Sequence, residues 1–507
     1  MTSPRVAELN SIVLRAKAAR DAGQWRSAIA LYSTANEIDG ARYDIKHNLA
    51  LSLIAENRVD DGLLYLKHAL ALKPDLWPSH VLKAKVMRGS GLIEEADAVL
   101  THILKHDPRN GHALLAAADL DMNEFGDAVG ARERVAPLLA DPTFKGEAEL
   151  TTLMSKLYDR DESDEELSDM LMDFAKRELS MPGFRFSADA MAGVSNRTGR
   201  KRVGLLSPMF CASPVYFLTI STFRELAKSF DLIILNRGVK EDWGTKAFRE
   251  IATEWHNVQN VDAETLANSI KKQSLDVLFD LGGWSDPIGL KALSVKPAKK
   301  MYKWVGGQSA TTGLTTFDGF ITDNVQSPTS ADRLHTEPLI RLRSCYVDYS
   351  EPAYFKSVPK DKNINSAIIG NPAKLSRSFA KHISVIKGEI VLIDKRYKHE
   401  KCRTTISDRI EKKELRFVST NDHINYLTHI AKCRNIIDTF PYSAGLTSIE
   451  ALSLGCNIRT ENAQMFSSRH SMTHVFHKNA ENSPHQKDLK LTTQYLIREI
   501  VENGNSP

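Results

Sequence analysis

The sequence contains few cysteines and no long hydrophobic run. Its cysteines are Cys211, Cys345, Cys402, Cys433 and Cys456. They are odd in number and lack Cys-x-x-Cys spacing, which argues against a disulfide framework or a zinc site and for a reducing compartment. No window approaches the ~20 apolar residues that a membrane helix needs, and the first residues lack the apolar segment of a signal peptide. We therefore expect a cytoplasmic protein without a membrane span.

The charge balance also lacks an excess of either sign. The 67 Lys and Arg residues against 63 Asp and Glu residues give a net charge of +4 over 507 residues, which gives no indication of a nucleic-acid partner. Histidines and aspartates do not cluster at metal-ligand spacings, so we expect no metal site and interpret His335, His423 and His470 as ordinary polar residues. The hydrophobic content of 42% is that of a globular protein, and the length allows roughly two to four domains.

Small residues recur every 34 positions in the first third of the chain. They are Gly23, Asn57 and Gly91 at a turn, Ala28, Gly62 and Ala96 five positions later, and Ala16, Ala50 and Ala84 seven positions before the turn. A helix–turn–helix period of 34 residues is typical of tetratricopeptide (TPR) repeats. We predict a TPR α-solenoid over residues 1–145, with a fourth unit around Gly126 and Ala131 that is offset by one residue. The groove of such an array commonly binds a peptide or protein partner; the alternative is that it packs only against the rest of the chain.

After the repeats, the predicted secondary structure changes. Residues 146–200 read as a helical connector that ends in a linker containing Gly193 and Gly199. From residue 201, short apolar strands alternate with helical stretches in two series, which a polar segment at residues 349–365 separates. The predicted strands are 202–206, 231–236, 275–281, 301–305 and 317–322, then 366–370, 389–394, 415–418, 435–438 and 457–460. This pattern predicts two Rossmann-like α/β domains, residues 201–358 and 359–507, with ligands at the carboxyl ends of the parallel strands.

One segment, residues 438–455, combines a strand end, a turn of small residues and a helix start. We expect the helix to begin at Thr447 or Ser448, with Glu450 in its first turn. The free N–H groups and the dipole at such a helix start favour phosphate or ribose hydroxyls. Taken alone, this strand–turn–helix is an ordinary connection in an α/β fold.

The spelling of this segment, Asp-Thr-Phe-Pro-Tyr-Ser-Ala-Gly-Leu-Thr-Ser-Ile-Glu-Ala-Leu, resembles the donor-sugar motif of the O-GlcNAc-transferase family of glycosyltransferases. Residues 203–210, 275–284, 296–307, 312–328 and 468–469 are similar to further motifs of that family, in the same order. The resemblance implies a GT-B fold after the TPR solenoid. It also implies an inverting, metal-independent transfer of a sugar from a nucleotide-sugar donor to a protein acceptor, with Ser or Thr modified, that the TPR groove recruits. No other cofactor is implied.

The resemblance also assigns donor-binding residues. Lys374 is in register with the lysine that binds the donor diphosphate, where an ammonium stabilises the leaving group without a proton transfer. Tyr426 stands in the place of a histidine that stacks on uracil, and Thr447 and Glu450 stand in the places of a threonine and a ribose-binding acid. The remaining implied donor contacts are Asn371, Gly445 and Ser448.

The chain departs from the family at the catalytic loop. Pro214 is retained, but Ser213 and Phe217 replace two histidines, and a serine cannot act as a general base without an activating partner. Asp242 and Asp286 are candidate bases, and the sequence does not choose between them. The donor can be UDP- or CMP-linked, as for a bacterial flagellin glycosyltransferase that uses a nonulosonic acid. Two alternatives stay open: a TPR adaptor with an inactive GT-B-like module, and a GT-B enzyme that acts on a glycan.

Overall fold

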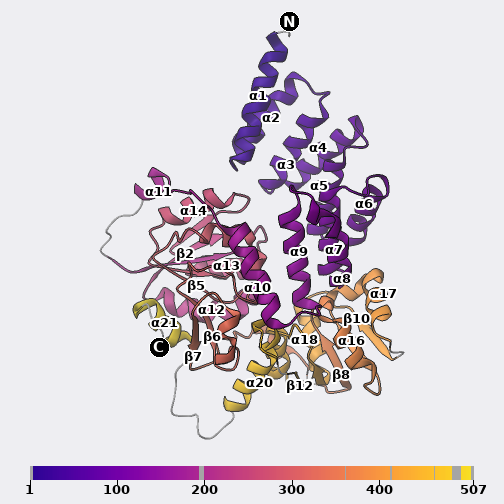
Figure 1. The fold of residues 1–507 in the computed structure, drawn as a ribbon, viewed down its shortest axis with the longest axis vertical. Helices are drawn as coiled ribbons and strands as arrows, with labels where there is room; N and C mark the ends of the chain where they lie inside the picture. The colour runs from indigo at the N-terminus through magenta and orange to yellow at the C-terminus, as the bar shows by residue number, and fades with distance from the viewer. Residues whose placement is uncertain are drawn as a thin grey trace. The chain divides into compact units, whose positions relative to one another are not determined.

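The computed structural model describes residues 4–192, 199–359, 361–411, 414–461, 463–481 and 493–503. It divides into two compact units (Figure 1). The first comprises Met1–Asp121, Gly130–Thr151 and Asn260–Asp262, and the second comprises Met122–Val129, Thr152–Gln259 and Ala263–Pro507. Of the predicted linker, residues 193–198 with Gly193 lie outside the described residues.

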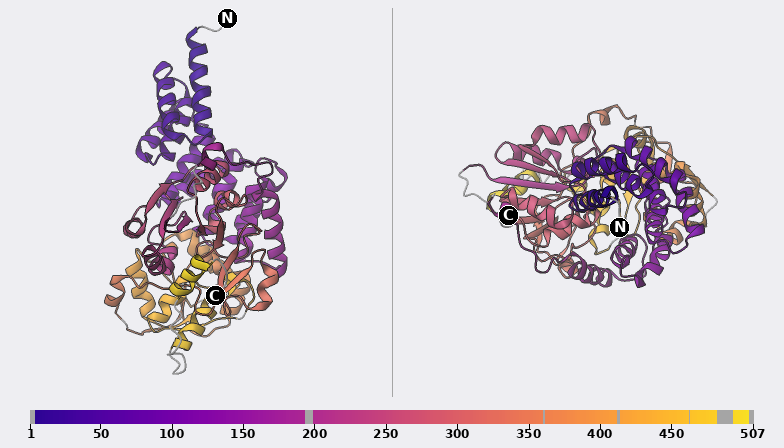
Figure 2. Two further views of the ribbon diagram at one scale, coloured as in Figure 1. Left: turned by 90° about the vertical axis from the view of Figure 1, so that its left-hand side faces the viewer. Right: turned by 90° about the horizontal axis from the view of Figure 1, so that it is seen from above.

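The first third of the chain forms the predicted array of antiparallel helices, which stack in sequence order (Figure 2). The helices are α1 (Pro4–Asp21), α2 (Trp25–Ile38), α3 (Tyr43–Ala55), α4 (Val59–Leu72), α5 (Trp77–Gly89), α6 (Ile93–His106), α7 (Gly111–Asn123) and α8 (Ala128–Val135). The turn residues Gly23, Asn57 and Gly91 have φ values of 69°, 63° and 79°, a conformation that glycine and asparagine tolerate best. The repeat prediction is therefore confirmed.

The small residues inside the repeats lie where helices approach each other closely. Ala28, Ala50 and Ala96 have no exposed surface. A Cβ atom on Gly62 would lie 2.5 Å from Cγ1 of Ile54, so a larger residue would push α3 and α4 apart. This crowding explains why the 34-residue pattern is visible in the sequence at all.

The connector contains α9 (Lys145–Tyr158), α10 (Asp164–Phe174), a π-helical turn at Ala175–Leu179 and α11 (Ala188–Ala192). Residues 159–169 are rich in Asp and Glu and contain a helix start, because Ser163 and Glu166 form a reciprocal capping box at the first turn of α10. No helix in the described part of the chain is long and apolar enough to span a bilayer.

The second unit contains two fully parallel sheets. The first has the order β3-β2-β1-β4-β5-β6-β7 and the second the order β10-β9-β8-β11-β12. The first sheet comprises β1 (Arg202–Ser207), β2 (Asp231–Asn236), β3 (Glu254–Asn257), β4 (Val277–Asp280), β5 (Lys300–Lys303), β6 (Gly319–Asp323) and β7 (Leu339–Leu342). The second comprises β8 (Ile364–Ile369), β9 (Ile390–Ile393), β10 (Leu415–Val418), β11 (Cys433–Ile437) and β12 (Asn457–Arg459). The predicted Rossmann-like α/β pair is confirmed, although the sequence analysis missed β3 and β7.

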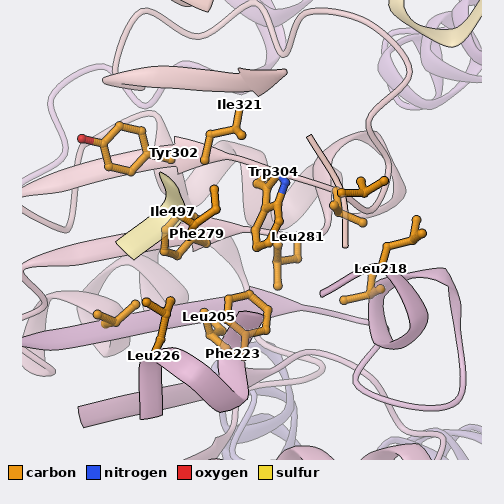
Figure 3. Close-up of a cluster of buried hydrophobic side chains, with 14 of the residues drawn as sticks. Leu205, Leu218, Phe223, Leu226, Phe279, Leu281, Tyr302, Trp304, Ile321 and Ile497 are labelled. Carbon is orange, nitrogen blue, oxygen red and sulfur yellow. The ribbon is translucent and has the colours of Figure 1, made fainter. Parts of the chain in front are cut away.

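Helices connect these strands and cover the sheets. They are α12 (Pro214–Ala227), α13 (Trp243–Ile251), α14 (Ala263–Lys272), α15 (Pro287–Leu293), α16 (Arg377–Ser384), α17 (Glu400–Arg409), α18 (His423–Ala431), α19 (Leu446–Ser453), α20 (His470–Glu481) and α21 (Thr493–Asn503). Figure 3 shows the core of the first sheet, in which Phe223, Phe279 and Trp304 pack together. Ile497 of α21 joins this core. A helix within the segment 359–507, which we predicted as one domain, therefore packs on the first sheet.

The turn of the fourth repeat belongs to the second unit and packs on the loop after β8. Gly126 has a φ of 73°, and a Cβ atom on it would lie 2.7 Å from Cβ of Pro372. Arg409 holds the two segments together by donating to the carbonyl oxygens of Gly126, at 2.8 Å, and Leu375, at 2.9 Å.

We expect Gly126→Ala to destabilise the protein by about 1–3 kcal/mol, because a left-handed backbone and a steric overlap both oppose the new methyl group. The urea midpoint of unfolding measures the effect. Gly89→Ala is the matched control, since nothing lies within 4 Å of a Cβ atom at that helical position; it should be neutral or stabilising. Equal midpoints for the two variants would contradict the packing described above.

Candidate functional site

The loop after β8 presents Lys374 from a short, rigid turn. Asn371 begins a 3-10 turn, Pro372–Lys374, and its side-chain oxygen accepts from the backbone N–H of Ala373 at 3.0 Å. The carbonyl of Ser443 accepts a hydrogen bond from Nζ of Lys374 at 2.8 Å. Gly370, with a φ of 99°, brings this loop against the side chain of Thr447. The structure therefore brings together Asn371, Lys374 and Thr447, which the sequence predicted as donor contacts.

The aromatic ring of Tyr442 packs against the ammonium of Lys374. Nζ of Lys374 lies 4.4 Å from the centroid of the Tyr442 ring, a cation–π contact. The other aromatic neighbour, Tyr158, stacks on Tyr442 with ring centroids 5.1 Å apart. The hydroxyl of Tyr442 lies 3.1 Å from the hydroxyl of Ser309, which follows β5. Groups from both sheets therefore fix the position of the ammonium.

Burial tunes the charge of Lys374. It lowers the pKa of the lysine to about 8, although the nearby Asp438 carboxylate favours the charged form. Asp438 is itself buried, which raises its pKa, while hydrogen bonds from Ala444 N at 2.8 Å and Thr460 Oγ1 at 2.9 Å oppose that shift. At neutral pH the ammonium is charged, poorly hydrated and able to bind an anion.

The helix start after β11 differs from the sequence prediction. Helix α19 begins at Leu446, one residue earlier than expected, and Gly445 occupies the N-cap without a side-chain cap. Glu450 is then the fifth helical residue, beyond the first turn, so our placement of it in that turn is wrong. The Ser448 hydroxyl donates within its own helix start, 2.7 Å from the Gly445 carbonyl and 2.9 Å from that of Ala444. The first-turn N–H groups of α19 have no side-chain cap, as an anion site requires.

Glu450 is the centre of a buried hydrogen-bonded chain. Its Oε1 lies 2.7 Å from Nε2 of His423, whose Nδ1 lies 2.7 Å from the hydroxyl of Tyr354. The Glu450 side chain is 1% exposed, and its Oε2 has no hydrogen-bond partner among the described residues. Burial raises the pKa of this carboxyl, and His423 opposes the shift. A buried oxygen without a partner is costly, so Oε2 is suited to accept a hydrogen bond from a ligand.

Tyr426 lies on the same helix as His423. The two rings stack with centroids 6.4 Å apart. The Tyr426 hydroxyl lies near Thr447 but, within the described structure, makes no hydrogen bond of normal geometry. Burial raises the pKa of this phenol well above its ordinary value. The predicted aromatic position therefore adjoins Glu450 and Thr447.

His423 is a site residue that the sequence analysis missed, because we interpreted it as an ordinary polar residue. Its imidazole contacts Phe217 of α12, with ring centroids 5.2 Å apart. No local pattern could reveal this role, because Glu450 is 27 positions away and Tyr354 is 69 positions away. The contact with Phe217 therefore joins helix α12, which follows β1 of the first sheet, to the Glu450 chain.

The residues that replace the family histidines have structural contacts. Ser213 is buried, and its hydroxyl donates to the Met209 carbonyl at 2.8 Å. Phe217 is 4% exposed and packs against the rings of Tyr216, Trp243 and His423. Neither side chain offers a group that could accept a proton at neutral pH.

The two candidate bases are helix caps. Asp242 caps α13 and also accepts from the backbone N–H of Ala212 at 2.9 Å. Burial opposes ionisation of Asp242, but the hydrogen bonds from Ala212 and Lys240 outweigh it and hold its pKa below the ordinary value. Asp286 caps α15 and pairs with the guanidinium of Arg237 at 2.8 and 3.0 Å. The pattern Asp-x-x-Thr at residues 242–245 and the Asp-Pro pair at 286–287 are sequence signals of such caps.

A strained loop after β5 completes the site. Val305, Gly306 and Gly307 all have positive φ values, of 43°, 58° and 55°, and a β-branched residue rarely adopts this conformation. The fully buried Lys303 holds the loop by donating to the carbonyl oxygens of Val305 at 2.7 Å and Gly306 at 2.6 Å. The loop leads directly to Ser309, the partner of Tyr442.

A sequence profile of glycosyl transferase family 41 matches residues 177–494, more than half of the chain. The chain belongs to glycosyl transferase family 41. Its similarity to the curated relatives that it matches is distant. The probable UDP-N-acetylglucosamine–peptide N-acetylglucosaminyltransferase SPINDLY of Eustoma exaltatum subsp. russellianum is 24% identical over 263 residues, and SPINDLY of Arabidopsis thaliana is 22% identical over 277 residues. These alignments cover 47% and 50% of this chain but 28% and 30% of the relatives, so the chain matches less than a third of their length.

A solved structure supports the architecture. A mutant O-GlcNAc transferase from Thermobaculum terrenum aligns with 99% of this chain and 90% of its own, with a TM-score of 0.58 and 18% identity. This match confirms the fold, a helical repeat array followed by two Rossmann-like sheets.

Proposed function

We propose that the protein transfers a sugar from a nucleotide-sugar donor to a protein acceptor, on Ser or Thr, with inversion and without a divalent ion in the reaction. The observation that carries this proposal is the pairing of Lys374, charged and poorly hydrated, with Glu450, whose buried Oε2 lacks a partner. One group suits a diphosphate and the other a ribose hydroxyl. Lys374 lies in the loop after β8 and Glu450 on the helix after β11, and these two strands are adjacent in one parallel sheet. The carboxyl ends of such strands are the usual position of nucleotides in parallel sheets and of donors in a GT-B fold.

Each donor-site residue has a role in this proposal. Lys374 stabilises the diphosphate as it leaves, which requires no proton transfer. Glu450 accepts from the ribose, and Tyr426 offers a ring for the base. His423 is a positioning residue, because it fixes Oε1 of Glu450 and leaves Oε2 for the ligand. Asn371 and Gly445 shape the two loops, and Thr447 and Ser448 lie at the helix start.

The acceptor is proposed to be a protein that the TPR groove recruits. Both SPINDLY relatives are named as probable peptide N-acetylglucosaminyltransferases, which supports a peptide acceptor here. None of the five cysteines forms a disulfide in the described part of the chain, which supports the proposed cytoplasmic location.

A second candidate, a nucleotide-sugar-binding adaptor without transfer activity, is favoured by one observation. Phe217, which replaces a family histidine, packs against the ring of His423 and cannot accept a proton. The other candidate bases, Asp242 and Asp286, cap helices. The donor site is the same in both candidates, which differ only in turnover.

A screen of UDP- and CMP-linked sugars tests the proposal. The thermal midpoint should rise with one donor class, and that donor should be turned over when acceptor proteins are supplied. Stabilisation without turnover would favour the adaptor. If no nucleotide sugar shifts the midpoint, the proposal is wrong.

His423→Phe should weaken donor binding about 10-fold while leaving kcat nearly unchanged. The variant keeps the ring but removes both nitrogens, and a hydrogen bond to a charged group contributes about 1.5–3 kcal/mol, part of which holds Glu450 in place. Titration calorimetry and the split between KM and kcat measure the effect. His429→Gln, on the same helix, is the control and should bind normally. Unchanged donor affinity in His423→Phe would show that Glu450 needs no positioning.

A further inference from the structure

Three side chains with different metal-binding chemistry converge at the end of β6. Asp323 is the last residue of that strand, Cys345 follows β7, and His477 lies on α20. Their ligand atoms all lie within 4.8 Å of one another. Oδ2 of Asp323 and Nε2 of His477 are 3.3 Å apart, close to the ~3.4 Å that two ligands bound at about 2.0–2.1 Å around one tetrahedral zinc ion would show.

The backbone around the cluster is already ordered. Oδ1 of Asp323 accepts from the N–H groups of Val325 at 2.9 Å and Gln326 at 2.8 Å, and Oδ2 accepts from that of Tyr346 at 3.0 Å. Because Tyr346 directly follows Cys345, the last bond also fixes the thiol beside the carboxylate. Supporting hydrogen bonds to a carboxylate are what orient metal ligands.

Helix α20 is held in register by a second contact of Tyr346. The Tyr346 ring stacks on His474, with centroids 6.4 Å apart, and its hydroxyl lies 3.2 Å from Nδ1 of His470. His477 is one turn further along the same helix. Its Nε2 is shielded from solvent and, among the described residues, makes no hydrogen bond of normal geometry, although it lies 3.3 Å from Oδ2 of Asp323. That nitrogen therefore faces the cluster.

We propose that Asp323, Cys345 and His477 bind a structural zinc ion, with a water molecule as the fourth ligand. A thiolate, an imidazole and a carboxylate are all zinc ligands, and the thiolate disfavours magnesium and calcium. On binding, the thiol proton of Cys345 is released to solvent and His477 coordinates through Nε2. The two anionic ligands then neutralise the charge of the ion.

Such an ion would join β6, the segment after β7 and α20. It takes no part in the proposed transfer reaction, and the proposal does not depend on that reaction. Sequence spacing gives no sign of it, since the ligands are separated by 22 and 132 positions. The Asp323 carboxylate also favours the charged form of Arg469, so the ion must compete with this cation.

Cobalt titration of the chelator-treated, reduced full chain tests the proposal. Cobalt should bind at one equivalent and give a thiolate-to-cobalt charge-transfer band that zinc abolishes. Zinc should also raise the thermal midpoint by a few degrees, about 2–5 °C. Cys345→Ser should lose the band, and His477→Gln should weaken binding at least 10-fold.

Cys456→Ser is the matched control, because it keeps an acceptor for Lys362 and should retain the cobalt band. The unaltered chain decides the question even if a variant fails to fold. Absence of a thiolate band at one equivalent of cobalt, or the same band in Cys345→Ser, would overturn the proposal. Donor binding is measured separately, so failure here leaves the proposed function untouched.

Discussion

Replacement of Lys374 by alanine is expected to reduce sugar transfer by about 100- to 1,000-fold, the usual cost of removing one preorganised charge stabiliser. The Ser443 carbonyl and the Tyr442 ring hold the Lys374 ammonium in place. A cation on a flexible side chain elsewhere in the site would lack this fixed position. Steady-state kinetics with the donor from the screen measure the loss. Lys381→Ala, an exposed lysine on α16, is the control and should retain full activity.

The same lysine predicts how donor binding depends on pH. Its pKa of about 8 lies below the ordinary value of a lysine, because burial disfavours the charged form. The ammonium is therefore present below pH 8 and is lost as the pH rises through 8, so donor affinity should fall over that range. The fall should vanish in Lys374→Ala. A flat profile in the unaltered protein would mean that this ammonium does not contact the diphosphate.

Lys303→Met should destabilise the protein by about 3–5 kcal/mol, as is typical when one partner of a buried ion pair is removed. Lys303 is fully buried, and its Nζ lies 3.4 Å from Oδ2 of Asp280, which is 2% exposed. The variant also leaves the carbonyls of Val305 and Gly306 without their donor. These carbonyls belong to a loop of left-handed residues that cannot easily satisfy them in another way.

Urea unfolding measures this loss, and Lys299→Met is its matched control. Lys299 also pairs with an aspartate, Asp276, but its side chain is 70% exposed, so its removal should cost about 0–1 kcal/mol. Because the Lys303 loop leads to Ser309 and Tyr442, Lys303→Met should also weaken donor binding. Equal stability of the two variants would mean that Lys303 does not hold the loop.

The sequence predicted those parts of the fold in which local sterics decide the residue type. Gly23, Asn57 and Gly91 mark the repeat because each turn needs a left-handed residue. Central strands such as β2 were predicted with their observed bounds because both faces are buried. The edge strand β3 was missed, since Glu254–Asn257 is only half-buried and carries polar residues that do not read as an apolar run.

Much of the candidate site could be assigned from the sequence only through the family resemblance. One part, His423, could not be assigned from the sequence at all. Lys374 and Glu450 follow strands, where a parallel sheet places ligand contacts. His423 became visible only in three dimensions, because its partners come from distant segments. Asp242 and Asp286 illustrate the opposite case, since their capping signals were present in the sequence and outweigh a catalytic interpretation.

A calorimetric titration compares donor binding by the unaltered chain and by Lys374→Ala, with the nucleotide sugar that gives the largest thermal shift. We expect one binding site per unaltered chain and an affinity at least about 10-fold weaker in the variant, because a charge-assisted contact to the diphosphate is lost. Equal affinity in the two proteins, or no binding to either, would contradict the assignment of this site to a nucleotide-sugar donor.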